Sequence, residues 1–590
     1  MLAHPFLVGV GVGRRSSMPD FPFDADLPGR PTSPWLASTL ESPPDEDSSR
    51  KTAAETESEA DPETRTEAEP ESERRPETTG TLDYAPLRAD RSVDVAVVGA
   101  GIAGLSTALE LRERGYSVVV LERDRIAAGT TGKSTAKLTS QHGLLYDHLR
   151  REFGRRQARQ YAQTQEAAID AVEERVDDLE IDCGFERHHS YLYGDRRDAM
   201  EREAAAATEA GLEATFVTSV PPFERSQAGV RFEDQAWFDP RAYLLGIADE
   251  LAGLEGASVH EGTRVTDLEP GSPCRIRTDA ASVEARRVVL ATGFPILDRA
   301  GYFARMHPKR SYVLGLRLDG RPPEGMYYRP GDDYRSIRTH RGEDETLLLV
   351  GGESHKTGQG GSARERYRRL EGWARERFPV EEVAYRWSTQ DYVTVDKVPF
   401  VGRAGPGAEN VYIATGFRGW GMTNGVAAGR LLAERIAGAE PAAGDLFDPL
   451  RFTPKTSLAD TLTENADAAS QFATDWARSL FSDDATPIAP GDGRVVRRGA
   501  KPVACARDDE GQLHEVSAVC PHTYCVVEWN DAEASWDCPC HGSRFAPDGN
   551  LLEGPATDDL SPRRSPSDAS HGSRSGSGFG SDSGSGSGSE

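Results

Sequence analysis

Two short cysteine–histidine motifs near the C-terminal end of the chain strongly constrain its fold. One residue separates Cys520 from His522, and two residues separate Cys538 from His541. Thiolate and imidazole groups bind iron and zinc, so these motifs predict two loops that converge on one metal centre. Tetrahedral zinc is one interpretation. Each motif combines one cysteine with one histidine, however, and this favours an iron–sulfur centre with the cysteines on one iron and the histidines on the other.

The residues around the second motif support the iron–sulfur interpretation. The segment 538–545 reads Cys-Pro-Cys-His-Gly-Ser-Arg-Phe and resembles the cluster-binding loop of Rieske [2Fe-2S] proteins. The resemblance implies that Cys520, His522, Cys538 and His541 are the ligands of such a cluster. Two neutral imidazole ligands raise its reduction potential above that of an all-cysteine cluster. The implied role of this part of the chain is one-electron transfer.

Further residues beside the motifs bear on the same centre. Rieske proteins of the cytochrome bc type carry a disulfide between the two cluster loops, so the resemblance implies a bridge from Cys525 to Cys540. Two buried thiols are the alternative. Ser543 matches a serine that hydrogen-bonds the cluster in that family, whereas Phe545 replaces a tyrosine. The missing hydroxyl implies a lower potential than in bc-type centres.

A glycine-rich motif nearer the N-terminus predicts a dinucleotide-binding unit. An apolar strand at 93–98 precedes Gly-Ala-Gly-Ile-Ala-Gly and a helical pattern, and a second strand at 117–121 ends at an acidic residue. In such a unit the glycines let the backbone approach a pyrophosphate at the helix N-terminus, and the acid binds ribose hydroxyls. The predicted cofactor-binding residues are Gly99, Ala100, Gly101, Ala103, Gly104 and Glu122.

FAD and NAD both bind to this kind of unit, and two further segments decide between them. The stretches 129–137 and 414–423 resemble the flavin-contacting segments of the D-amino acid oxidase and glycine oxidase superfamily. The resemblance implies that the cofactor is FAD. It also implies cofactor contacts from Arg123, Thr131, Lys133, Ser134, Lys137, Val265, Thr292, Gly293, Gly416, Gly421 and Met422. For the two lysines, an ordinary surface position is the alternative.

The same resemblance implies an α/β fold with two parts. A Rossmann-type FAD-binding domain is expected to interleave with an antiparallel substrate sheet, and a small all-β Rieske domain is expected to follow. Residues 89–446 are assigned to the flavin-dependent oxidoreductase domain, 447–490 to a helical connector and 491–560 to the Rieske domain. Apolar runs at 311–318 and 346–351 predict strands of the substrate sheet.

Both ends of the chain are expected to be disordered. Residues 1–88 form an acidic N-terminal region, and no Val, Ile, Leu, Met or aromatic residue occurs between Leu40 and Leu82. Such a stretch cannot bury enough apolar surface to offset the entropy of ordering. Within this region, 27–36 resembles the short N-terminal lead of Rieske-bearing flavoproteins. Residues 561–590 form a tail rich in serine and glycine.

Composition limits the classes of partner. A formal net charge of -27 argues against nucleic-acid binding, because a polyphosphate requires a basic surface. No apolar run reaches about 18 residues, so no membrane span is expected. The apolar start is short and lacks a basic segment before it, which disfavours a signal peptide. The expected location is the cytoplasm.

The implied chemistry is the two-electron oxidation of a small amine or amino acid at FAD. Electrons would then leave one at a time through the cluster to a one-electron acceptor protein or a quinone. Amino acid oxidases of this fold commonly hold the substrate carboxylate with an arginine, which is missing from the corresponding stretch 385–392. Arg386 and Arg418 are candidates to replace it, and a substrate without a carboxylate is equally compatible. Trp387, Gln390, Tyr392 and His355 are candidates to line the pocket, with ordinary packing as the alternative, and the catalytic residues are unknown.

Two other functions remain open on sequence grounds. In the first, FAD accepts hydride from NAD(P)H and the cluster feeds an oxygenase or another acceptor. That function requires a nicotinamide site, and the glycines at 358–361 follow a polar loop rather than a strand. In the second, the chain is a redox-sensing module without turnover.

Overall fold

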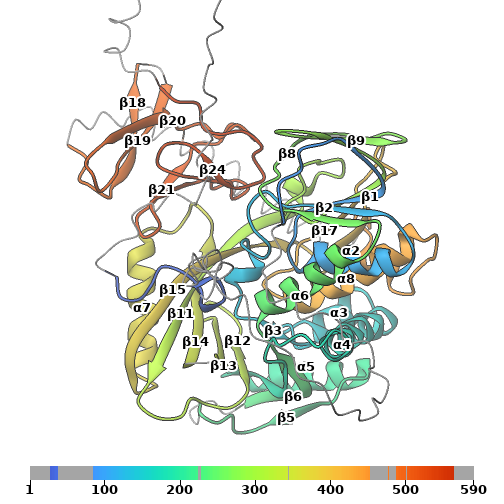
Figure 1. The fold of residues 1–590 in the computed structure, drawn as a ribbon. Helices are drawn as coiled ribbons and strands as arrows, with labels where there is room; N and C mark the ends of the chain where they lie inside the picture. The colour runs from blue at the N-terminus through green and yellow to red at the C-terminus, as the bar shows by residue number, and fades with distance from the viewer. Residues whose placement is uncertain are drawn as a thin grey trace, which may run out of the picture.

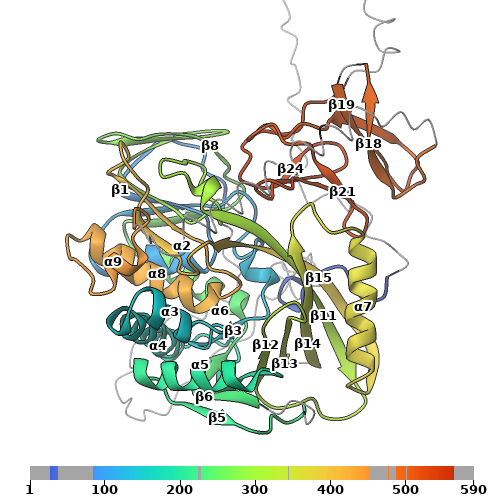
Figure 2. The same ribbon diagram turned by 180° about the vertical axis from the view of Figure 1, so that it is seen from behind.

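The structure is a computed structural model, and it describes residues 27–37, 84–223, 228–342, 345–451, 476, 487–499 and 501–563. A nucleotide-binding sheet with its helices lies beside an antiparallel sheet, and the C-terminal strands form a smaller body (Figure 1). In both views this body lies beyond one end of the long strands β11 (Met306–Leu318) and β15 (Val380–Thr394) (Figure 2).

The nucleotide-binding sheet is built around a central strand, β1 (Arg91–Val98). β1 pairs in parallel with β10 (Ser282–Leu290) on one side and with β2 (Val118–Leu121) on the other. Apart from the partly buried Val93, their valines and leucines are buried, as expected for parallel strands that are covered on both faces. The sheet also contains β7 (Ala257–His260), β8 (Val265–Glu269), β9 (Cys274–Thr278), β16 (Phe400–Arg403) and β17 (Val411–Thr415).

Two helices pack closely against each other beside this sheet. A Cβ atom on Gly425 of α8 (Gly421–Ile436) would lie 2.6 Å from Ile102 Cγ2 of α2 (Ile102–Glu113). A Cβ atom on Gly429 would similarly lie 2.8 Å from the Ser106 Cβ. Glycine at these positions therefore lets the two backbones approach, which places the first turns of α2 and α8 side by side.

The antiparallel sheet follows the order β15-β11-β14-β13-β12-β4-β6-β3, with β5 paired to β6, and its one parallel pair among the described strands is β12 with β4. Its remaining strands are β3 (Lys137–Leu138), β4 (Glu186–Gly194), β5 (Ala214–Val217), β6 (Ala228–Trp237), β12 (Met326–Arg329), β13 (Arg335–Arg341) and β14 (Thr346–Lys356). The apolar runs that predicted strands at 311–318 and 346–351 lie in β11 and β14. Helix α7 (Ala363–Arg375) packs on the sheet through Tyr367, Leu370 and Ala374.

The other helices continue on the side of α2 and α8, toward β5 and β6 at the outer end of the antiparallel sheet (Figure 1). They are α3 (Tyr146–Glu152), α4 (Arg155–Asp178), α5 (Arg197–Ala210), α6 (Pro240–Gly253) and α9 (Gly444–Phe447), with the 3-10 turns η1 (Thr131–Lys133) and η2 (Tyr302–Ala304). Asp239 caps α6 by accepting hydrogen bonds from the backbone of Arg241 and Ala242. A proline at the first helical position also favours this start.

The C-terminal body consists of two small antiparallel sheets. The first contains β18 (Gly493–Arg498), β19 (Lys501–Arg507) and β20 (Leu513–Ser517). The second contains β21 (Glu528–Asn530), β22 (Ser535–Asp537), β23 (Arg544–Phe545) and β24 (Leu551–Glu553). The core of this body includes Trp536, Phe545 and the buried Cys520 and Cys538, so the cluster motifs lie in all-β structure.

The N-terminal region differs in part from the prediction of disorder for residues 1–88. Residues 27–37 are ordered, and α1 (Pro34–Ala37) buries the Trp35 side chain, which is 1% exposed. The Trp35 indole packs in a cluster with Trp387, and this buried surface offsets the cost of ordering residues 27–37. Residues 1–26 and 38–83 lie outside the described residues.

Two other predicted segments are only partly covered by the structure. Most of the predicted connector at 447–490 and the tail from residue 564 onward lie outside the described residues. Within the part of the chain that the structure does describe, no helix is both long and apolar enough to cross a membrane.

Candidate functional site

The glycine turn after β1 forms one end of a long pocket. Gly99 has a φ of +104°, and a Cβ atom there would lie 2.6 Å from the Ala291 carbonyl oxygen. A Cβ atom on Gly104 would lie 1.8 Å from the Gly99 carbonyl oxygen, so only glycine fits at both positions. Gly101 caps α2 without a side-chain hydrogen bond. The turn therefore brings helix N–H groups to the pocket, where a pyrophosphate fits.

Glu122 stabilises the same turn from the end of β2. Its carboxylate accepts hydrogen bonds from the backbone N–H groups of Ala100 at 2.8 Å and Asp124 at 2.9 Å. Burial raises the pKa of Glu122, and these two N–H groups act in the opposite direction. The predicted ribose-binding acid thus lines the pocket and also fixes the glycine turn.

Most of the predicted flavin contacts come together around this pocket. Those that line it are Gly99, Gly101, Ala103, Glu122, Arg123, Thr131, Ser134, Lys137, Val265, Thr292, Gly293, Gly416, Gly421 and Met422. Ala100 and Gly104 shape the turn from behind. Lys133 is not part of the lining, and its Nζ lies 3.3 Å from the carboxylate of Glu553, which does line the pocket.

The far end of the pocket is a chamber of aromatic and basic side chains. Tyr328, Tyr334 and Trp420 line it, and Lys309 Nζ lies 5.0 Å from the centre of the Tyr334 ring. Lys137 donates hydrogen bonds to the Tyr327 carbonyl at 3.2 Å and to the Ser336 hydroxyl. Burial lowers the pKa of both lysines, for Lys137 well below its usual value.

One acidic and one basic side chain, Asp391 and Arg418, also line the pocket. The Asp391 carboxylate accepts hydrogen bonds from the backbone N–H groups of Tyr392 and Gly419. Burial raises the pKa of Asp391 to about 6. Arg418 lines the pocket with a φ of +59° and donates a hydrogen bond to the Lys397 carbonyl at 3.0 Å. The site therefore holds a carboxylate and a guanidinium in buried surroundings.

The other candidate for binding a substrate carboxylate serves a structural role. Arg386 donates hydrogen bonds to the carbonyl oxygens of Leu27 and Gly29 and ties the N-terminal segment to β15. Trp387 and His355 also lie outside the pocket lining. The Trp387 indole donates to the Lys133 carbonyl at 2.8 Å, and the His355 ring stacks on Tyr312. Gln390 and Tyr392 do line the pocket.

The four predicted cluster ligands converge in the C-terminal body. The rings of His522 and His541 lie 4.9 Å apart at 89°, and the Cys520 and Cys538 side chains are buried. Burial lowers the pKa of both histidines, that of His541 to about 4, so both imidazoles are neutral at physiological pH. Neutral imidazole is the form that binds metal, so this donor set fits a [2Fe-2S] cluster.

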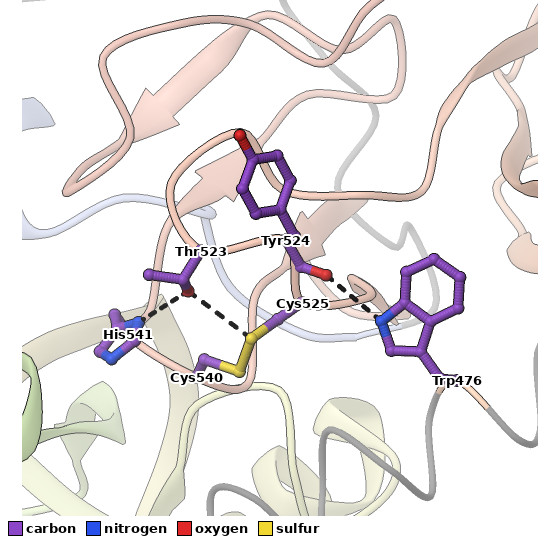
Figure 3. Close-up of a disulfide and its surroundings, with 6 residues drawn as sticks. All are labelled: Trp476, Thr523, Tyr524, Cys525, Cys540 and His541. Carbon is purple, nitrogen blue, oxygen red and sulfur yellow. Dashed lines mark hydrogen bonds between the residues drawn. A yellow bond between two sulfur atoms is a disulfide. The ribbon is translucent and has the colours of Figure 1, made fainter.

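The cysteines that flank these ligands join the two cluster loops. Cys525 and Cys540 lie at disulfide distance, with their Cα atoms 6.4 Å apart (Figure 3). The Thr523 hydroxyl lies 3.6 Å from the Cys525 sulfur and 3.2 Å from His541 Nδ1. On the outer side, the Trp476 indole donates to the Tyr524 carbonyl at 3.3 Å (Figure 3). The bridge therefore holds both loops beside the ligands.

Pocket residues also contact the second cluster loop directly. Tyr392 donates its hydroxyl proton to the His541 carbonyl at 3.3 Å, and Gln390 donates to the Gly542 carbonyl at 2.8 Å. The Phe294 ring lies 6.1 Å from each of the His522 and His541 rings and 5.2 Å from the Tyr392 ring. Two aromatic side chains therefore lie between the flavin pocket and the cluster.

Several residues of the site escaped the sequence analysis. Lys309 lies on β11 and Tyr328 on β12, where only strand alternation hinted at a side facing the pocket, and Phe294 and Tyr334 lie in loops, where no periodicity applies. Leu551 and residues 553–557 of the C-terminal body also line the pocket. No local sequence pattern marks a segment whose partner lies in another domain.

Comparisons with known proteins agree with both the flavin pocket and the predicted cluster site. The model of the FAD dependent oxidoreductase family matches residues 94–435, and that of the Rieske [2Fe-2S] domain matches residues 479–563. YhfW, a Bacillus subtilis (strain 168) protein named for a Rieske 2Fe-2S iron-sulfur centre, is 36% identical over 81% of this chain and 95% of its own length. The gamma-glutamylputrescine oxidoreductase of Escherichia coli (strain K12) is 26% identical over 60% of this chain and 87% of its own length.

Solved structures share the fold of the flavin domain. The glycine oxidase of Geobacillus kaustophilus aligns with a TM-score of 0.51 at 18% identity, covering 61% of this chain and 99% of its own. The chain is therefore an enzyme of the FAD dependent oxidoreductase family, with FAD as the cofactor of this domain and a [2Fe-2S] cluster as that of its Rieske domain.

Proposed function

We propose that this enzyme oxidises a small amine or amino acid at FAD and passes the electrons singly to the Rieske cluster. The observation that carries the proposal is the position of Phe294 and Tyr392, which both line the flavin pocket. The Phe294 ring lies beside the His541 ring, and the Tyr392 hydroxyl contacts the His541 carbonyl. Electron transfer through protein requires cofactors that are close together. This arrangement places the flavin pocket next to the cluster site, so no movement of the domains is needed. The final acceptor is a one-electron acceptor protein or a quinone.

The proposed roles of the pocket residues follow from their positions. Gly99, Gly101 and the first turn of α2 hold the pyrophosphate, Glu122 holds the ribose, and Val265 contacts the adenine. The segment with Gly416, Gly421 and Met422 forms the pocket wall at the first turn of α8. When bound, FAD accepts two electrons from the substrate and can release them one at a time.

The chamber beside this wall suits the oxidation of an amine. Lys309 and Arg418 place positive charge near the substrate, which disfavours the protonated ammonium form. The neutral amine is the form with the free electron pair that oxidation requires. Tyr328, Tyr334 and Trp420 provide apolar surface that excludes water and packs against the carbon skeleton. Arg418 is the pocket-lining arginine that we assign to a substrate carboxylate, should the substrate carry one.

Anaerobic mixing identifies the electron donor. Purified protein is mixed separately with a panel of amines and amino acids, with NADH and with NADPH, and the flavin absorbance is followed. We expect at least one amine or amino acid to bleach the flavin and both nicotinamides to leave it oxidised. Rapid bleaching by NADH or NADPH, with none by the amines, would contradict the proposal and support the reductase function instead.

A further inference from the structure

One wall of the flavin pocket comes from the Rieske domain. Leu551 and residues 553–557, which include the end of β24, line the same pocket as the glycine turn and Val265. The flavin domain is thus not the sole source of the cofactor site. This observation depends on the FAD cofactor of the family and on no assumption about the substrate.

Flavin-domain side chains hold the backbone of this segment in place. Arg123 donates a hydrogen bond to the Leu552 carbonyl at 2.6 Å, and the Tyr392 hydroxyl oxygen lies 3.3 Å from the Gly554 carbonyl oxygen. Arg264 donates to the Thr557 carbonyl. Each of these donors also lines the pocket. The segment 551–557 is therefore pinned along its length to the rim of the cofactor site.

Glu553 is the charged anchor of the segment. Its carboxylate lies 3.3 Å from Lys133 Nζ and 3.4 Å from Arg310 of the flavin domain, and 3.2 Å from Arg544 of its own domain. Burial would raise the pKa of Glu553, but these three cations, Lys133 foremost, hold it well below its usual value. The carboxylate therefore stays charged at physiological pH and bridges the two domains.

Arg310 extends this bridge into a buried ion cluster. Its side chain is 1% exposed and lies 3.5 Å from Glu533 and 3.7 Å from Asp537, both in the Rieske domain. Arg544 pairs with the same two carboxylates at 2.5 Å and 2.9 Å. Removing one member of such a cluster leaves uncompensated buried charge, which is strongly unfavourable. These buried ion pairs therefore favour a single docked position of the Rieske domain.

We propose that the docked Rieske domain retains FAD, because segment 551–557 closes the pocket over the dinucleotide. FAD leaves only when this segment lifts from the rim. Binding linkage is reciprocal, so FAD in turn stabilises the docked position of the Rieske domain. The Rieske domain is thereby a structural part of the flavin site as well as an electron carrier.

Glu553→Gln in the full, cluster-loaded chain tests this proposal. The substitution keeps the shape of the side chain and removes the charge that holds it to Lys133 and Arg310. Glu510→Gln, on an exposed turn of the same domain, is the matched control. The rate of FAD release on dilution is followed by flavin fluorescence, and the cluster absorbance checks that the Rieske domain is intact.

We expect Glu553→Gln to release FAD roughly tenfold faster than the control, the loss of one charge-assisted pair worth about 1.4 kcal/mol. A change below about threefold, the range of weak surface pairs, would overturn the proposal. Slower release would also overturn it, because it would mean that Glu553 merely repels the pyrophosphate.

Hydrogen exchange in the unaltered chain tests the reciprocal effect and does not depend on a variant that folds. Flavin-stripped protein is compared before and after FAD is added back. Backbone amides in 551–557 should exchange more slowly with FAD, whereas those in 508–513, on the far side of the Rieske domain, should not change. Equal exchange in 551–557 with and without FAD would overturn the proposal. Neither readout requires turnover, so both results stand whatever the substrate proves to be.

Discussion

At the level of single residues, the second cluster loop keeps one hydroxyl and lacks another. The Ser543 oxygen accepts a hydrogen bond from the Ala556 backbone N–H at 3.0 Å, which leaves its proton free for the Cys520 sulfur. Phe545 is fully buried and carries no hydroxyl. Hydrogen bonds to cluster sulfurs stabilise the reduced, more negative state and so raise the potential.

Phe545→Tyr should therefore raise the cluster potential, and Ser543→Ala should lower it. One net hydrogen bond of about 1 kcal/mol corresponds to roughly 40 mV for a one-electron couple. A redox titration followed by EPR measures both shifts. Phe545→Leu, which adds no hydroxyl, is the control and should not raise the potential. Equal potentials in the Tyr and Leu variants would refute this explanation.

Gly101 tests the cofactor site at the same scale. A Cβ atom there would lie 3.1 Å from Thr131 Oγ1, and a larger side chain would intrude where backbone must approach the pyrophosphate. We expect Gly101→Val to lose FAD while it keeps the Rieske EPR signal, with Gly253→Val, at the exposed end of α6, as the control. Stoichiometric FAD in Gly101→Val would show that the flavin binds elsewhere.

At the scale of elements, the end of β15 carries a pH-sensitive contact. Asp391 is hydrogen-bonded to the Gly419 backbone, which links β15 to the loop before α8, and its pKa is raised from 3.8 to about 6 by burial. When a carboxyl group has a higher pKa in the folded state than in the unfolded state, its contribution to stability is fully present below the unfolded-state pKa. The contribution is lost as the pH rises to the folded-state pKa. Ionising Asp391 therefore destabilises the fold between about pH 4 and pH 6.

Asp391→Asn removes this titration. Relative to the unaltered protein, the variant should gain about 2–3 kcal/mol in free energy of unfolding as pH rises from 4 to 7. Urea unfolding of both proteins at several pH values measures the difference. Parallel stability curves across this range would mean that Asp391 titrates normally.

The sequence predicts the individual elements better than it predicts their partners. The glycine turn and β1 were predictable because they follow one local pattern of apolar, glycine and acidic residues. The roles of Lys133 and Arg386 were not, because each pairs with a group that is distant in sequence, Glu553 or the Leu27 carbonyl. Segment 551–557 was missed for the same reason. Local periodicity reports which face is buried, but it does not identify the partner on that face.

At the scale of the whole molecule, a buried ion cluster sets the relation between the two domains. Arg310 projects from the flavin-domain sheet toward Glu533, Asp537 and Glu553 of the Rieske domain. Arg310→Met should weaken docking by about 3–5 kcal/mol, because three carboxylates would share fewer cations. Calorimetry should then resolve a separate transition for the Rieske domain at lower temperature. An unchanged single transition would show that apolar contacts alone hold the domains together.

The proposed function requires that flavin and cluster exchange electrons within one chain. It is tested most directly by anaerobic freeze-quench EPR after mixing with a substrate that bleaches the flavin. We predict that flavin bleaching is followed by the reduced Rieske signal at a rate independent of protein concentration, and that Cys538→Ser retains the bleaching without the signal. A flavin that is fully bleached while the cluster stays oxidised, or a transfer rate proportional to protein concentration, would contradict the account.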